Sequence, residues 1–420
     1  MAENLKTSGS GRPETSTFEA EVGAEIKGKL NDYSIAAILR YGNFSNIATC
    51  RKEKTEEVFV LKCIKKKHYN SEERELKALK CLKSLDPDKN NIVRFYSCFK
   101  YKTCFCFEFE LLDISLYDFM ERREWKPLSV AEIRPIAQQM LVALTALKSI
   151  GVTHSDIKPA NILLVNQESK PFKVKLIDFG ASCMTSNFTQ FHEIQSFGYR
   201  APEVYLGLRP DESVDMWGLG CTLLFLFFGQ HFYPTSQCEL CQKKPKHVWK
   251  FRTPKQYIRV TRTFTDENGD LNAFIDLIKN MLVVDPLKRI LPADALNHKY
   301  ISMEHLNEVD KSPYRTMAKE IMSVCELSRK TDSDTDDADK ESYDSDFSLK
   351  DSRNTMNDVK LIFEERFLIQ HKSTVYHIYE SLGLFDYLKK ISSKRLSVSE
   401  IRPIAKQMLV ALSALKRIGV

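Results

Sequence analysis

A short, ordered set of polar residues beside apolar runs is the feature that most limits what this chain can fold into. Residues 154–164 read HSDIKPANILL, and seventeen residues after Asn161 comes Asp178, the first residue of DFG. The carboxylate of Asp156 can accept the proton of an incoming hydroxyl, and the ammonium of Lys158 can neutralise a transferred phosphoryl group. Asn161 and Asp178 offer the hard oxygen ligands that Mg²⁺ prefers. Each residue alone would be ordinary, but the ordered set predicts a phosphoryl-transfer site.

The distribution of apolar residues predicts two lobes of different structure. Residues 1–28 are rich in Ser, Thr, Gly and Glu and indicate a disordered arm. Short β-rich runs with one interrupting helix then follow, and from Ser115 to Leu306 the pattern is mainly helical. The runs are Ile35–Leu39, Ile47–Arg51, Val58–Ile64, Ile92–Phe99 and Cys104–Phe109, and the helix is Ser71–Leu85. We therefore expect an α+β fold with a β-rich lobe over residues 29–112 and a helical lobe over residues 113–308.

The last quarter of the chain combines an acidic stretch with an internal repeat. The stretch from Thr331 to Asp351 contains nine acidic residues and only two lysines, so residues 309–354 are predicted to be a disordered linker. Beyond it, residues 396–420 copy residues 128–152 at 21 of 25 positions and stop before any counterpart of Asp156. Residues 355–420 are thus a truncated repeat without the catalytic set. It is a degraded second copy, a regulatory module that packs on the first domain or a partner, or a helix that exchanges with the first domain.

Composition excludes several classes of protein. A 420-residue chain with 43% hydrophobic residues is neither wholly disordered nor a disulfide-stapled miniprotein. Eleven scattered cysteines indicate a reducing compartment, and residues 1–12 lack the apolar run of a secretory signal. The longest apolar run, Cys221–Phe228, is far shorter than the roughly 20 residues that span a bilayer. No periodic basic stripe accompanies the net charge of +6. We expect an intracellular protein with no membrane segment and no direct nucleic-acid binding.

The ordered motifs resemble those of eukaryotic protein kinases. Ala201-Pro202-Glu203 supplies a third motif, Asp215-Met216-Trp217-Gly218 resembles the start of the family's central buried helix, and Arg289 matches the arginine that pairs with the motif glutamate. The likeness covers about residues 33–306. It implies a bilobal protein-kinase fold that uses ATP and Mg²⁺. It also implies catalytic roles for Asp156 and Lys158 and metal binding by Asn161 and Asp178.

The resemblance extends to the nucleotide-binding residues. Val60-Leu61-Lys62 matches the strand whose lysine holds the ATP phosphates, and Glu75, thirteen residues later, should pair with Lys62. Of the three glycines in the family's phosphate-covering loop only Gly42 is present, with Arg40 and Ser45 at the other two positions, which predicts weak ATP affinity. The resemblance implies ATP binding by Leu39, Gly42, Ile47, Lys62, Glu75, Glu110 and Leu112.

Within the kinases, the chain resembles the homeodomain-interacting protein kinases. The residues that carry this likeness are Leu116-Tyr117-Asp118-Phe119, Ile133-Arg134-Pro135, Val174 to Gly180, Gln195-Ser196 and Tyr199-Arg200. The resemblance implies a monomeric Ser/Thr kinase of signalling or transcriptional regulation, in the nucleus or the cytoplasm. In the wider proline-directed group the counterpart of Arg200 engages a backbone carbonyl that then cannot serve the substrate, so proline after the target Ser or Thr is favoured.

Two departures from this subfamily leave alternatives open. Glu193 stands where the relatives carry an activation-loop tyrosine, and it either replaces part of a phosphotyrosine charge or is an ordinary loop residue. Phe197 stands where arginine is usual. Together with the missing glycines, Phe197 favours the rival function, a pseudokinase scaffold that binds partners with little or no turnover.

The sequence also leaves two interpretations of a cysteine pair open. A zinc site at Cys238 and Cys241, with the nearby His231 and His247, is one; free thiols are the other, because only half of a zinc spacing is present.

Overall fold

The structure is a computed structural model that describes most of the residues up to Cys325. The described ranges are 21–28, 32–41, 45–52, 55, 57–65, 69–102, 104–190, 192–233, 265–306 and 313–325. They fall into two compact units: the N-terminal unit runs to Lys83 and includes Val93–Leu111, and the C-terminal unit holds Ser84–Ile92 and the chain from Leu112 onward. The acidic run after Thr331 and the truncated repeat at 355–420 lie outside the described residues.

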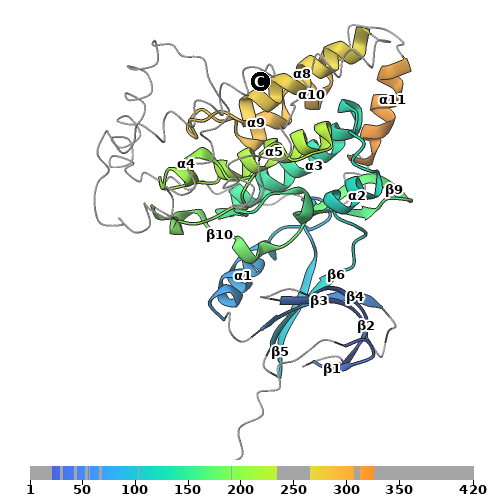
Figure 1. Cartoon of the computed structure of the whole chain (residues 1–420), viewed down its shortest axis with the longest axis vertical. Helices are drawn as coiled ribbons and strands as arrows, with labels where there is room; N and C mark the ends of the chain where they lie inside the picture. The colour runs from blue at the N-terminus through green and yellow to red at the C-terminus, as the bar shows by residue number, and fades with distance from the viewer. Residues whose placement is uncertain are drawn as a thin grey trace, which may run out of the picture. The chain divides into compact units, whose positions relative to one another are not determined.

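The N-terminal unit is built on a six-stranded antiparallel sheet in the order β1-β2-β3-β4-β6-β5, accompanied by one helix (Figure 1). Its elements are β1 (Glu25–Lys27), β2 (Asp32–Tyr41), β3 (Ser45–Lys52), β4 (Val58–Lys65), α1 (Tyr69–Leu82), β5 (Phe95–Tyr101) and β6 (Cys104–Glu110). The five predicted β-rich runs correspond to β2–β6, and the predicted helix to α1. The short β1 falls within the predicted disordered arm, where Ile26 is fully buried against the sheet and pairs with Tyr33.

Successive side chains of β4 point to opposite faces of the sheet, so that one face carries core residues and the other carries Lys62. Cys63 pairs with Cys106 of β6 and enters the buried core, with the two sulfurs 3.3 Å apart. Because successive side chains leave a strand on opposite faces, the preceding Lys62 points away from that core. In register it lies opposite Phe107 of β6, which is fully buried. The sheet thus fixes the direction in which the Lys62 ammonium extends.

The C-terminal unit is mainly helical and carries two short antiparallel strand pairs, β7 with β10 and β8 with β9. Its helices are α2 (Leu116–Arg122), α3 (Val130–Ser149), α4 (Pro202–Tyr205), α5 (Ser213–Phe228), α8 (Thr265–Met281), α9 (Pro292–Leu296), α10 (Lys299–Ser302) and α11 (Pro313–Met322). Its strands are β7 (Val152–Thr153), β8 (Ile162–Asn166), β9 (Lys170–Leu176) and β10 (Cys183–Met184). Its 3₁₀ turns are η2 (Pro159–Asn161), η3 (Phe179–Ala181), η4 (Thr185–Asn187), η5 (Glu304–Leu306) and η6 (Ser323–Cys325).

Two long helices form the centre of this unit. Helix α3 begins with a reciprocal capping box between Ser129 and Glu132, which satisfies free N–H groups of its first turn. Helix α5 includes the longest apolar run of the sequence and is buried along almost its whole length. It ends at Gly229 with φ of 67°, where an added Cβ would lie 2.0 Å from the carbonyl oxygen of Trp125. Only glycine fits that position without displacing the backbone. In the described part of the chain no helix combines the length and the apolarity that crossing a membrane requires.

Helix α11 lies where the sequence predicts linker. Its residues Tyr314 and Ala318 are buried against Ala131, Met303 and Leu306, so one face of the helix completes a small apolar core. The spacing of four residues places Tyr314 and Ala318 on the same face of the helix. The composition of the neighbouring acidic stretch hides this amphipathic pattern, and the ordered C-terminal unit continues to Cys325.

A buried ionic cluster ties α11 to the rest of the unit. The Tyr314 hydroxyl donates to Asp270 of α8 at 2.6 Å, and Asp270 also contacts Arg134 of α3 and His305. Arg134 and Asp270 are both fully buried. Burial alone would raise the pKa of Asp270, but the contacts with His305, Arg134 and Tyr314 outweigh it and hold that pKa below its ordinary value.

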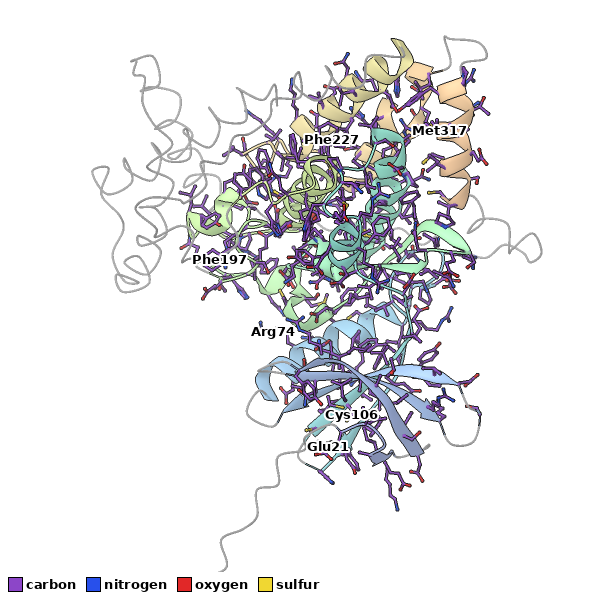
Figure 2. All side chains as sticks on the ribbon, turned by 45° about the vertical axis from the view of Figure 1, so that its right-hand side comes forward. Glu21, Arg74, Cys106, Phe197, Phe227 and Met317 are labelled. Carbon is purple, nitrogen blue, oxygen red and sulfur yellow. The ribbon has the colours of Figure 1, made fainter. Side chains whose placement is uncertain are left out.

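Removing the Tyr314 hydroxyl is expected to destabilise the C-terminal unit. Tyr314→Phe in the full chain takes one of three hydrogen-bond donors from a buried carboxylate, which costs about 1–3 kcal/mol. The free energy of unfolding in urea measures this loss. Met317→Ala is the matched control, because Met317 lies on the same helix but is exposed (Figure 2), and a change there should stay within about 0.5 kcal/mol. Equal stability of Tyr314→Phe and the wild type would contradict the anchoring role.

Candidate active site

The predicted ion pair of the N-terminal unit joins β4 to α1. Nζ of Lys62 lies 2.7 Å from Oε1 and 2.9 Å from Oε2 of Glu75. The Glu75 side chain is 1% exposed and that of Lys62 is 12% exposed. A carboxylate buried this deeply requires a compensating charge, so the pair holds the Lys62 ammonium in one position. This arrangement suits a lysine that must meet an anionic ligand.

The remaining residues of this unit that are predicted to bind nucleotide differ in strand position and exposure. Ile47 of β3 is the cross-strand neighbour of Lys62, so both side chains leave the sheet on the same face. Leu39 of β2 is 56% exposed. Glu110, at the end of β6, accepts a hydrogen bond from the backbone N–H of Arg94 through a side-chain oxygen.

Two further residues predicted to bind nucleotide lie elsewhere. Leu112 belongs to the C-terminal unit and is buried. Gly42 lies outside the described residues. Arg40 and Ser45, which replace glycines of the family pattern, are part of β2 and β3. Nucleotide binding by all seven residues stays a prediction.

In the C-terminal unit, the loop between β7 and η2 gathers polar groups around Asp156. Oδ2 of Asp156 lies 2.6 Å from Nζ of Lys158 and 3.1 Å from Nδ2 of Asn161. Oδ1 accepts hydrogen bonds from the Ser196 hydroxyl at 2.7 Å and from the Ser196 backbone N–H at 3.1 Å. Lys158 also donates to the Ser196 hydroxyl at 2.8 Å. A carboxylate, an ammonium and a hydroxyl thus meet at one point, which is what general-base chemistry on a hydroxyl requires.

Asp215, at the start of α5, holds this loop in place. Its two carboxylate oxygens accept the backbone N–H groups of His154 at 2.7 Å and Ser155 at 2.8 Å. Ser155 has φ of 68°, a left-handed conformation that a non-glycine residue adopts only when its surroundings impose it. Burial raises the pKa of Asp215 to about 7, even though the two N–H donors favour its charged form. The loop is therefore anchored to the most buried helix of the unit.

His154 connects the same loop to the segment that precedes Asp178. Its Nε2 lies 2.9 Å from the Ile177 carbonyl oxygen, and its Nδ1 accepts the Asp156 backbone N–H at 3.2 Å. Burial lowers the pKa of His154, and its two ring contacts fit the neutral tautomer with hydrogen on Nε2. The Phe179 ring packs edge-on against the imidazole at 5.0 Å.

Asn161 and Asp178 offer a donor set that fits Mg²⁺. The Ile177 backbone N–H donates to the Asn161 carbonyl at 2.9 Å, which brings the two segments together. Nδ2 of Asn161 donates to Asp156, so its amide oxygen is the atom left to act as a ligand. Asp178 has φ of 62° and accepts the Gly180 backbone N–H. An amide oxygen and a carboxylate are hard ligands of the kind Mg²⁺ prefers. Among the described residues no cluster of three or more His, Cys, Asp or Glu side chains could hold a metal.

Ser196 is the functional contact that sequence reasoning missed. The sequence singles out Gln195-Ser196 only as part of a resemblance, without a role for the hydroxyl. The structure places that hydroxyl between Asp156 and Lys158, which lie 40 and 38 residues earlier in the chain. Only the position of a hydroxyl residue shortly before Ala201-Pro202-Glu203 could have drawn attention to it.

The segment around Ser196 is fixed by Gln195 and Arg200. Gln195 has φ of 65°, and its carbonyl oxygen accepts two hydrogen bonds from the Arg200 guanidinium, at 2.8 and 3.2 Å. The Gln195 side chain donates to the Val214 carbonyl and accepts the Ala201 backbone N–H. The backbone carbonyl engagement implied by the kinase resemblance for Arg200 is therefore present in the fold. Glu193 is exposed, beside this segment.

The ion pair implied for Arg289 and Glu203 is also formed. Nη1 and Nη2 of Arg289 lie 2.7 and 2.9 Å from the two oxygens of Glu203, and both side chains are essentially fully buried. Arg289 additionally donates to the carbonyl and hydroxyl of Ser213. This bidentate pair ties the end of the Ala201-Pro202-Glu203 motif to the start of α5.

The zinc alternative stays a prediction, because most of its residues fall outside the part of the chain that the structure describes. Cys238, Cys241 and His247 lie outside the described residues. Nδ1 of His231 is 2.8 Å from the Tyr199 hydroxyl, and its ring packs against Phe225. That histidine thus has a packing role in the described fold.

Comparisons with known proteins identify the family. Residues 33–301 match the protein kinase domain family. The chain is 32% identical over 355 residues to homeodomain-interacting protein kinase 1 of Mus musculus, covering 70% of this chain and 29% of that protein. It is 33% identical over 356 residues to homeodomain-interacting protein kinase 2 of Mesocricetus auratus, covering 70% and 30%. It is 30% identical over 357 residues to homeodomain-interacting protein kinase 4 of Homo sapiens, covering 69% and 58%.

A solved structure gives the same assignment for the fold. A crystallised kinase domain aligns with a TM-score of 0.56 at 24% sequence identity, over 69% of this chain and 99% of that domain. The chain spans about three tenths of the length of the first two relatives. Since the family match extends over well more than half of the residues and contains every motif described above, this chain belongs to the protein kinase domain family.

Proposed function

We propose that this protein is an ATP- and Mg²⁺-dependent protein serine/threonine kinase. The observation that carries the proposal is the environment of Asp156. One carboxylate oxygen accepts a hydrogen bond from the Ser196 hydroxyl, with the two oxygens 2.7 Å apart, while the other lies 2.6 Å from the Lys158 ammonium. A site that holds a hydroxyl against a carboxylate, next to a cation, has the components for deprotonating a serine or threonine and attracting a phosphoryl group.

Each residue of the proposed active site has a distinct part in this chemistry. Asp156 orients the substrate hydroxyl and accepts its proton, and Lys158 stabilises the negative charge that collects on the transferred group. Asn161 and Asp178 would hold Mg²⁺, which supplies positive charge to the ATP phosphates. Lys62, fixed by Glu75, would hold the phosphates of ATP. Ser196 positions Asp156 and Lys158 through its two contacts.

The contacts of Gln195 support a preference for proline after the phosphorylated residue. The Gln195 carbonyl oxygen accepts two hydrogen bonds from the Arg200 guanidinium. An ordinary residue at that position of a substrate would bury an N–H without an acceptor, which costs about 1–3 kcal/mol. Proline has no N–H and loses nothing. We therefore propose Ser-Pro and Thr-Pro sites as substrates.

The relatives are named as homeodomain-interacting kinases, and we propose a role in signalling or transcriptional regulation. Location in the nucleus or the cytoplasm stays a prediction.

Phosphoryl transfer by the full chain from labelled ATP with Mg²⁺ tests the proposal. A Ser-Pro peptide should be phosphorylated at least about fivefold more efficiently, in kcat/KM, than the same peptide with Ser-Ala, as the unpaired N–H predicts. Asp178→Asn should abolish transfer, because the metal loses its carboxylate ligand. Glu168→Gln, in an exposed turn between β8 and β9, should leave transfer unchanged. No transfer at saturating ATP would favour the pseudokinase scaffold instead.

A further inference from the structure

The two ends of the loop that carries Asp178, residues 177–182, are hydrogen-bonded to the same residue, His154. At the first end, Nε2 of His154 lies 2.9 Å from the Ile177 carbonyl oxygen. At the second end, the Ser182 hydroxyl donates a hydrogen bond to the His154 carbonyl oxygen at 3.0 Å. His154 and Ser182 are both fully buried. The loop is therefore closed against a residue two positions before Asp156.

The Ser182 hydroxyl extends the pairing of two short strands. β7 and β10 are antiparallel, with Thr153 opposite Cys183, so the same register brings His154, directly after β7, opposite Ser182, directly before β10. The backbone N–H of Ser182 donates instead to the Phe179 carbonyl oxygen at 3.1 Å, within the 3₁₀ turn η3. At this point the side chain of Ser182 makes the link to the opposite segment. An alanine at the same position would keep the turn and lose the link.

Asp178 depends on this link because its backbone is strained. Its φ is 62°, a left-handed conformation that a non-glycine residue keeps only when its surroundings impose it. The Asp178 side chain is exposed, whereas the contacts of the loop ends with His154 are buried. The direction of the Asp178 carboxylate thus follows from how firmly both ends of the loop are held.

We infer that Ser182 is a positioning residue, whose hydroxyl holds the loop so that the Asp178 carboxylate keeps the orientation in which it binds Mg²⁺. This inference rests on the proposed kinase function. Ser182 itself contacts neither the metal nor the substrate in this account. It acts through the loop, so its removal should affect the requirement for metal more than the handling of the peptide.

The variant Ser182→Ala in the full chain tests the inference through the metal dependence of phosphoryl transfer. The free Mg²⁺ concentration that gives the half-maximal rate at saturating ATP should rise about fivefold, which corresponds to about 1 kcal/mol, the usual worth of one hydrogen bond. Saturating Mg²⁺ should recover most of the wild-type kcat, and the KM for a Ser-Pro peptide should stay within about twofold of the wild type, since only metal binding is weakened.

Two further variants serve as the control and the rescue. Ser186→Ala is the same chemical change four residues later, at an exposed serine of the same segment, and should leave the Mg²⁺ requirement unchanged. Ser182→Thr keeps a hydroxyl that can donate to the His154 carbonyl oxygen, so it should require less Mg²⁺ than Ser182→Ala.

Amide hydrogen exchange without nucleotide or metal tests the same link in the absence of turnover. Exchange in residues 178–184 should be at least about fivefold faster in Ser182→Ala than in the wild type, because the segment opens more often once a hydrogen bond is lost. Exchange in α8, elsewhere in the unit, should be the same in both. Ser186→Ala should exchange like the wild type in both segments.

Other outcomes would overturn the inference. A lower kcat for Ser182→Ala at an unchanged Mg²⁺ requirement would show that Ser182 acts on the loop of Asp156 instead. A lower free energy of unfolding in urea, with no change in the Mg²⁺ requirement, would make its role structural only. Absence of phosphoryl transfer together with faster exchange in Ser182→Ala would contradict the kinase proposal alone. Phosphoryl transfer together with equal exchange in the wild type and Ser182→Ala would contradict the inference alone.

Discussion

Replacing Asp156 with asparagine is expected to lower kcat for peptide phosphorylation by about 10²–10⁴-fold, the usual contribution of a general base. Asparagine has one acceptor oxygen in place of two, so it can keep the hydrogen bonds from Ser196 but turns an N–H₂ group toward Lys158. Asp215 still anchors the loop through the backbone N–H groups of His154 and Ser155, so the fold should survive while the group that accepts the proton is lost. Initial rates with labelled ATP, Mg²⁺ and a Ser-Pro peptide measure the effect, and the KM for ATP should change little.

The control for this variant is Asp294→Asn, the same chemical change at an exposed position of α9 in the same unit. It should leave kcat within about twofold of the wild type, since exposed substitutions away from a site have small effects. Asp156→Asn with nearly wild-type kcat would show that another group accepts the proton. Loss of the folded far-ultraviolet circular dichroism spectrum would show instead that the loop needs the charge to fold.

Replacing Arg289 with methionine should cause the largest loss of stability in the C-terminal unit. It leaves the Glu203 carboxylate, which is 1% exposed, without its bidentate partner, and it removes two hydrogen bonds to Ser213. Breaking a buried ion pair by removing one member costs about 3–5 kcal/mol. Unfolding in urea, followed by tryptophan fluorescence, measures the loss, because Trp217 lies 5.3 Å beneath the Arg289 guanidinium.

A second ion pair of the same unit provides the matched control. Lys148 pairs with Glu212, but the two side chains are 40% and 28% exposed. Lys148→Met should change the free energy of unfolding by less than about 1 kcal/mol, as is usual for exposed pairs. The double variant Arg289→Met with Glu203→Met should recover much of the stability lost by Arg289→Met alone, because no unpaired charge then remains buried. A similar loss for Arg289→Met and Lys148→Met would contradict the structural importance of the buried pair.

The elements that the sequence predicts well are those with a local signal. The strands β2–β6 and helix α1 follow from periodicity within a few residues of their own positions. The pairs Lys62–Glu75 and Arg289–Glu203 were expected because the kinase resemblance supplies both partners, and both contacts are present. In these places the local pattern and the global fold agree.

The features that escaped prediction depend on the path of the chain between distant segments. The contact of Ser196 with Asp156 requires the left-handed backbone at Gln195, which no side-chain pattern announces. Arg134 is quoted in the sequence only as part of a resemblance, and its buried partner Asp270 lies on a helix more than a hundred residues away. Helix α11 was missed because the acidic composition that follows it outweighed two well-spaced buried residues.

The anchoring of α11 shows that the C-terminal unit is longer than the residues that match the kinase domain family. The family match ends at residue 301, yet Tyr314, Val324 and Cys325 are all buried in the C-terminal unit. A boundary drawn from similarity marks what relatives share, whereas a boundary drawn from burial marks what must fold together. A gene fragment cut at the family limit would expose Ala131 and Leu306 to water and take a donor from Asp270. The cooperative unit of this kinase domain therefore ends at or beyond Cys325.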